Sequence, residues 1–269
     1  MSKYFSDGLK EIDKQVIEGL KTLPLSHNCP FRQLQSILDD KIIKANPCNI
    51  FEGEELAYFF YGKPTYFDDE AFLPVFLLFD FFENENVEHR IAPFDTGAYF
   101  KGHLDKNKKG NLNDANKGIC LNDFCYDSDV GEDSIDYGKK IVNYFFTSNN
   151  HYYRNLIKKG IKHLSLPSAY YNKIVSGRSY TQYYDSRSSS IEVQFKKDFD
   201  LTKNKIIYAL IPSDIGDLVK TKLKLLNPNV KIDVYMEEEF GYEEQHLRDL
   251  LTEAKVMVRN FLEVNGYFN

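Results

Sequence analysis

The longest apolar run of the chain extends from Phe72 to Phe82 and is interrupted at Asp80. Most of it, LPVFLLFDFF at residues 73–82, consists of side chains that favour strands, and apolarity at nearly every position predicts a strand buried on both faces. Such a strand belongs inside a sheet that has other segments packed on each side. The run is shorter than the roughly 18 apolar residues of a membrane-spanning helix, so we expect no transmembrane helix.

Other periodic segments surround this strand in an irregular order. Apolar residues at helical spacing predict helices at residues 4–22, 31–38, 136–146, 149–159 and 243–262. Short alternating or apolar segments predict strands at residues 23–29, 42–43, 56–64, 73–82, 190–195, 206–211 and 231–235. We expect a structured loop at 91–102 and a series of turns at 167–190. Because strands and helices do not alternate regularly, the pattern favours an α+β fold over a doubly wound sheet.

The chain is long enough for one large core. It has 269 residues, of which 42% are hydrophobic and 28% charged, as in ordinary globular proteins. We therefore expect a single domain over residues 1–269. Residues 103–134 differ from the rest because they are rich in Asn, Asp, Lys and Gly and poor in large aliphatic side chains. This composition predicts a polar insertion or a lid.

Charge and cysteine content favour a cytoplasmic protein. A net charge of −6 argues against a generic nucleic-acid binder, whose affinity depends on neutralising phosphates. The first residues, MSKYFSDGLKEIDKQ, are too charged for a signal peptide, and no membrane association is expected. The four cysteines have no zinc-site spacing, so we expect reduced thiols. They are Cys29, Cys48, Cys120 and Cys125.

Several widespread motifs are missing from the sequence. It contains neither GxGxxG nor GxxxxGK[ST], so a Rossmann fingerprint and a P-loop are not supported. It also contains no HExxH, EF-hand loop or GxSxG element. The chemistry must therefore be sought in dispersed residues.

Three separated segments carry such residues. The first, LSHNCPFRQLQSILDDKII at 25–43, places His27 near the end of an expected strand, with a short helix after it. The second, ELAYFFYGKPTY at 55–66, is an aromatic strand. The third, DSRSSSIEVQF at 185–195, places Glu192 in an expected strand. This order resembles the ADP-ribosyltransferase superfamily, in particular the branch whose active site contains a His, a Tyr and a Glu.

The resemblance implies a split, mostly antiparallel sheet with flanking helices and an NAD cleft between its halves. His27 would hydrogen-bond the adenosine ribose. Tyr61, or as second choice Tyr58, would stack on the nicotinamide. Glu192 would stabilise positive charge at the ribose carbon as the bond to nicotinamide breaks. Arg187 would pair with the pyrophosphate through its planar guanidinium.

Two positions differ from many members of that superfamily. The His is usually followed by a small, hydroxylic or aromatic residue and then a Thr, whereas here Asn28 and Cys29 follow His27. Many members also carry Gln or Glu two residues before the catalytic Glu, whereas this chain has Ser190 there. Gln194 instead follows Glu192 by two residues. The acceptor class therefore stays open.

The functional hypothesis is an NAD-consuming ADP-ribosyltransferase-like enzyme, such as a bacterial toxin or phage-defence effector. NAD would be the co-substrate, and the acceptor would be a protein, a nucleic acid or a small molecule. One alternative is a non-catalytic regulatory protein that binds a protein partner through its aromatic residues and charged insertion. Another is a metal-dependent hydrolase that uses His89, Asp95, His103 and Asp105, although their spacing fits no metal motif and we expect no metal site. Asp95 is equally suited to capping backbone amides in a turn.

Overall fold

The computed structural model describes residues 4–10, 12, 14–65, 73–80, 88–104, 113–114, 119–128, 134–162, 165–176, 186–214, 217–236 and 244–268. Much of the expected polar insertion at 103–134, including Asp105, lies outside these residues, as does 177–185 of the expected turns. The expectations of a lid and of a single domain stay predictions.

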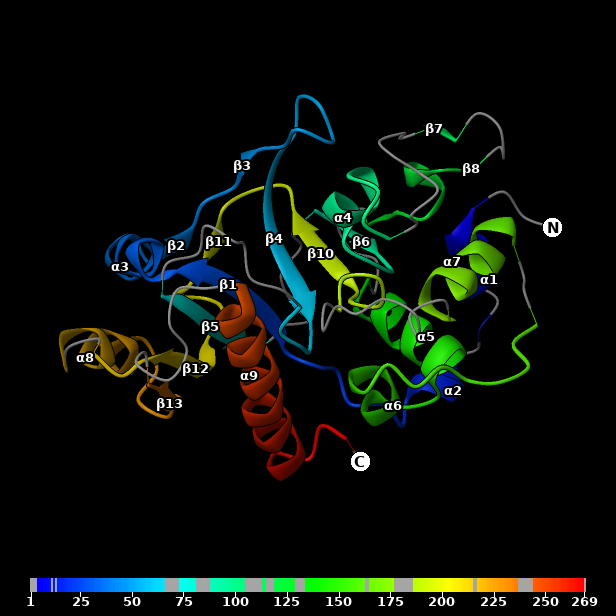
Figure 1. Cartoon of the computed structure of the whole chain (residues 1–269). Helices are drawn as coiled ribbons and strands as arrows, with labels where there is room; N and C mark the ends of the chain where they lie inside the picture. Colours follow the sequence, from blue (N-terminus) through cyan, green and yellow to red (C-terminus); the bar gives the residue numbers. More distant parts are fainter. Residues whose placement is uncertain are drawn as a thin grey trace.

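A mostly antiparallel sheet forms the centre of the described structure (Figure 1). Its strands follow the order β13 (Lys231–Tyr235), β12 (Ile206–Pro212), β5 (Pro74–Phe79), β1 (Leu25–Pro30), β4 (Glu55–Tyr61), β10 (Glu192–Phe195), β6 (His89–Ala92) and β9 (Tyr126–Ser128), and β3 (Asn46–Pro47) pairs with β4. β12 and β13 are parallel, and the other pairs are antiparallel. Two small pairs accompany the sheet: β2 (Ile42–Ile43) with β11 (Phe199–Asp200), and β7 (Asn113–Asp114) with β8 (Ile119–Cys120).

Helices flank the sheet, so the predicted mixed α+β class is confirmed (Figure 1). A cluster near the N-terminus contains α1 (Phe5–Lys10), α2 (Lys14–Ile17), α5 (Ser134–Phe146), α6 (Asn149–Tyr153) and α7 (Leu166–Ser176). The remaining helical elements are α3 (Phe31–Asp40), α4 (Thr96–Phe100), η1 (Leu121–Asp123), α8 (Asp217–Leu226) and α9 (Glu244–Val264). No helix among the described residues combines the length and the apolarity needed to cross a membrane.

The predicted strand at 73–82 is confirmed as β5, and all six of its residues are buried. Phe76 and Leu78 contact the core beneath α9, while Val75, Leu77 and Phe79 belong to the larger core on the other face. Burial on both faces explains why this segment is apolar at successive positions.

Several sequence predictions are wrong in part. The helix expected at 149–159 ends at Tyr153 as α6. The single helix expected at 4–22 is divided into α1 and α2, because Ile12 bonds back to Leu9 in a turn between them. The loop expected at 91–102 contains the end of β6 and all of α4, whose first turn Asp95 caps by accepting from the Ala98 amide at 2.7 Å.

The turns expected at 167–190 begin with helix α7 instead. Tyr170, Tyr171, Ile174 and Val175 are buried at helical spacing, so their packing outweighs the polar composition of the segment. Helix α8 was not expected at all; its Lys-rich residues 220–224 surround a narrow buried face at Val219 and Leu223.

Candidate active site

A pocket of about 770 Å³ opens where β1 and β4 diverge. Both strands are fully described, and they pair with each other at two positions near the start of β1. Beyond these positions the pocket is lined by β1, β4 and α3, and by Glu192 and Asp95 from the far side of β4. Its volume lies within the range of small-molecule sites.

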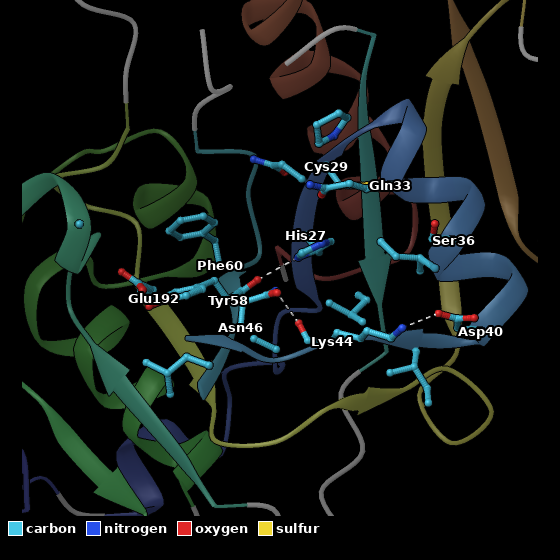
Figure 2. A pocket seen from close by; sticks show the side chains of 18 of the residues that line it. His27, Cys29, Gln33, Ser36, Asp40, Lys44, Asn46, Tyr58, Phe60 and Glu192 are labelled. Atoms are coloured by element: carbon cyan, nitrogen blue, oxygen red, sulfur yellow. Dashed lines mark hydrogen bonds and ion pairs between the residues drawn. The ribbon is translucent and has the colours of Figure 1, made fainter. Parts of the chain in front are cut away.

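Figure 2 shows the arrangement of the labelled side chains. Glu192 lies at one end, His27 and Tyr58 lie near the middle, and Ser36 and Asp40 of α3 lie at the other end. The pocket therefore extends from Glu192 in the sheet to the polar side chains of α3.

His27 is half-buried, and its imidazole is fixed by backbone. Its Nδ1 lies 2.9 Å from the carbonyl oxygen of Tyr58. Because a carbonyl can only accept, Nδ1 carries the proton and the neutral ring keeps its Nε2 lone pair as an acceptor. Burial lowers the pKa of His27, which favours this neutral form, although the bond to Tyr58 opposes the shift.

The half-buried Tyr58 is held from its hydroxyl end. The hydroxyl donates to the Sγ of Cys48 at 2.9 Å. That sulfur also accepts from the backbone amides of Ile50 at 3.3 Å and Phe51 at 3.2 Å. Burial and the bond to Cys48 raise the pKa of Tyr58, so the phenol stays neutral. Tyr58 is one of the residues that line the pocket.

Glu192 is a buried carboxyl group surrounded by donors. Its side chain is 2% exposed. It accepts from the amide of Thr96 at 2.5 Å and the hydroxyl of Thr96 at 3.2 Å. The Nε2 of Gln194 donates to the same carboxylate at 2.7 Å.

Two opposing influences set the protonation of Glu192. Burial, and then the nearby charge of Asp95, raise the pKa of Glu192 to about 8. The hydrogen bonds from Gln194 and Thr96 act in the opposite direction because they favour the charged form. A carboxyl group that ionises near neutral pH inside a pocket is suited to acid–base or charge-stabilising chemistry.

Two of the predicted site residues do not line the pocket. Tyr61 is three residues from Tyr58 on the same strand and therefore points to the opposite face of the sheet. There its hydroxyl accepts from the Leu23 amide at 3.0 Å, and its ring lies near that of Tyr152. Arg187 is also absent from the lining; its carbonyl accepts from the Asp95 amide at 2.9 Å.

Two other cations line the pocket instead. Arg32 is exposed on the first turn of α3. Lys44 follows β2 and pairs with Asp40 at 2.9 Å. Arg32 lies on α3, and Lys44 is held beside α3 by its ion pair with Asp40.

Metal ligation has no cluster to support it in the described part of the chain. No group of three or more His, Cys, Asp or Glu side chains there is arranged to hold a metal ion. All four cysteines are free. The hydrolase alternative stays a prediction, since Asp105 lies outside the described residues.

Comparisons of the chain with protein-family models, curated proteins and solved structures gave no significant match. The functional argument therefore depends on the residues of the pocket.

Proposed function

We propose that this chain is an NAD-consuming enzyme of the ADP-ribosyltransferase-like type. One observation carries the proposal: His27, Tyr58 and Glu192 come from three neighbouring strands, β1, β4 and β10, and line one pocket. The sequence resemblance implies this combination of residue types. It also implies a split sheet, and the short pairing between β1 and β4 is consistent with a cleft at that place.

Each of the three side chains has a state that suits its proposed role. The Nε2 of neutral His27 can accept a hydrogen bond from a ribose hydroxyl. The ring of Tyr58 offers an apolar face for stacking on nicotinamide, and it takes the role first assigned to Tyr61. Glu192 presents a carboxyl group whose orientation is fixed by Thr96 and Gln194. Because its pKa is raised to about 8, the charged form used in this role becomes the larger fraction as the pH rises through that value.

The proposed reaction breaks the bond between the ribose carbon and the nicotinamide nitrogen. The bonding electron pair leaves with nicotinamide, and positive charge develops on the ribose carbon. The Glu192 carboxylate would stabilise that charge at short range in a site of low dielectric constant. The acceptor, or water, would then bond to the same carbon and lose its proton.

The remaining lining residues are compatible with a dinucleotide. The pyrophosphate needs cations, and Arg32 and Lys44 supply them on the α3 side. Arg32 therefore takes the role first assigned to Arg187. An Arg is suited to it because its guanidinium donates two parallel hydrogen bonds to phosphate oxygens.

The proposal is tested by incubating purified protein with NAD and measuring released nicotinamide by chromatography. We expect release by the natural sequence and a loss of at least about 100-fold in Glu192→Gln, which removes the charge but keeps the size of the side chain. Glu263→Gln is the matched control, because Glu263 is exposed on α9. Absence of nicotinamide release with a broad panel of acceptors, or equal release by Glu192→Gln, would show that the proposal is wrong.

A further inference from the structure

A row of polar side chains crosses four strands beside the pocket. Tyr58 of β4, Gln194 of β10, Arg90 of β6 and Asp127 of β9 are direct neighbours in the strand register. Gln194 is 0% exposed and Arg90 is 5% exposed. Directly opposed side chains on adjacent strands interact, so the register places an amide and a guanidinium within reach of each other.

Gln194 connects Arg90 to Glu192. Its Oε1 accepts from Nη1 of Arg90 at 3.3 Å. Its Nε2 donates to Glu192 at 2.7 Å and to the hydroxyl of Thr96 at 2.9 Å. Because a guanidinium can only donate, Arg90 selects the amide orientation in which the NH₂ group faces the carboxylate. The opposite orientation would place two oxygen acceptors against each other and two donors together.

Arg90 is itself fixed on three other sides. Its Nη2 donates to Glu54 at 2.8 Å, and its Nε donates to Asp127 at 3.2 Å. Its guanidinium carbon lies 3.9 Å from the centre of the Phe51 ring. The loop that carries Phe51 and Glu54 also contains Cys48, the acceptor for the Tyr58 hydroxyl. Arg90 therefore contacts the loop that holds the Tyr58 hydroxyl and also contacts Gln194, which holds Glu192.

We infer that Gln194, oriented by Arg90, is a positioning residue that holds the Glu192 carboxyl group in place and favours its charged form. The inference deepens the proposed function and rests on it for the catalytic use of Glu192. The contact itself is independent of any substrate.

The charged and titratable groups around Glu192 determine how loss of the Gln194 hydrogen bond changes the ionisation of Glu192. Asp95, before α4, disfavours the charged carboxylate. Tyr58 on β4 and Cys125 after η1 are also close enough to interact with it electrostatically, and both are neutral at physiological pH because burial raises the pKa of each. Arg90 on β6 is connected to the carboxyl group through Gln194, which accepts from Arg90 and donates to Glu192. Without Gln194, the hydrogen bonds from Thr96 remain, but the opposition to desolvation and Asp95 is weaker.

The first test measures ionisation without any reaction. Protein labelled with ¹³C at the glutamate carboxyl carbon is titrated by NMR, and the Glu192 resonance is identified by its loss in Glu192→Gln. In Gln194→Met, which keeps the length of the side chain but removes its hydrogen bonds, we expect about a tenfold smaller acid dissociation constant for Glu192. Gln35→Met is the matched control, because Gln35 is exposed on α3 and does not line the pocket. An unchanged Glu192 titration in Gln194→Met would overturn the inference.

Arg90→Lys provides a second variant if Gln194→Met does not fold. Lysine keeps the charge but cannot form the same set of directed hydrogen bonds. We expect the Glu192 dissociation constant to fall in this variant too, and no change would again contradict the inference.

The second test uses nicotinamide release. We expect Gln194→Met to lower kcat about tenfold near neutral pH with little change in KM, and to recover at higher pH as Glu192 ionises. A loss that is the same at every pH would indicate a structural role and overturn the inference. If the natural sequence releases no nicotinamide, the proposed function is wrong, while the NMR titration still decides whether Gln194 controls Glu192.

Discussion

Glu192→Gln is expected to change the pH dependence of stability in a defined direction. The ordinary pKa of this group is 4.5, and burial beside Asp95 raises it to about 8 in the folded protein. Between these values the folded state keeps a proton that the unfolded state has released, so stability falls as pH rises. At about 1.4 kcal/mol per pH unit, the full interval corresponds to about 5 kcal/mol. The variant has no such group and does not show this decrease.

The assay is urea denaturation of both proteins, followed by circular dichroism, from about pH 5 to about pH 9. At the lowest pH the variant is expected to be no more stable than the natural sequence, because its amide presents an NH₂ group to the donors Thr96 and Gln194. Its relative stability then increases with pH until about pH 8, where the difference levels off. A difference that does not vary with pH over this interval would refute the description of Glu192 as a buried carboxyl group with a raised pKa. The exposed control Glu263→Gln is expected to show no such trend.

Two further predictions concern β1 and the residue that follows β4. The ¹⁵N NMR spectrum of His27 is expected to show a neutral ring protonated on Nδ1 near pH 7, as the bond to the Tyr58 carbonyl and the lowered pKa require; a ring protonated on Nε2 would contradict the geometry. Gly62→Ala is expected to lower the free energy of unfolding by more than about 1 kcal/mol relative to Gly53→Ala, as measured by urea denaturation. Both glycines have positive φ angles, but a Cβ at Gly62 would lie 2.5 Å from Cδ1 of Leu23, whereas one at Gly53 meets open space; equal effects would refute the packing described.

Local patterns predicted the strands and helices with strong periodicity. β5 was evident because its sequence is apolar at every position, as burial on both faces requires. α3 was evident because Leu34, Ile37 and Leu38 recur at helical spacing and form its buried face. α4 and α7 were missed for different reasons. α4 has only five residues after its Asp95 cap, which is too short for helical periodicity to be recognised. α7 contains serines and tyrosines that are typical of turns, but most of them are buried here by tertiary contacts.

The sequence predicted some site residues but not how they are held. Of the residues that it proposed for the site, His27, Tyr58 and Glu192 line one pocket, whereas Tyr61, its first choice of tyrosine, does not. An aromatic strand does not reveal which of its faces meets the pocket when both faces are apolar. That choice depends on the sheet order.

The contact between the two positioning residues could not have been predicted from the sequence. Arg90 and Gln194 are 104 residues apart in the chain and become neighbours because β10 inserts between β4 and β6. No local motif records this strand order. The position of Gln194 two residues after Glu192 was the available signal, because alternation puts both side chains on one face of a strand.

The most direct measurement of the central claim is a crystal structure of Glu192→Gln grown with saturating NAD. We predict NAD in the pocket between β1, β4 and α3, with the nicotinamide ribose beside residue 192 and the ring against Tyr58. A structure in which NAD is absent, or occupies another surface while this pocket stays open, would contradict the account.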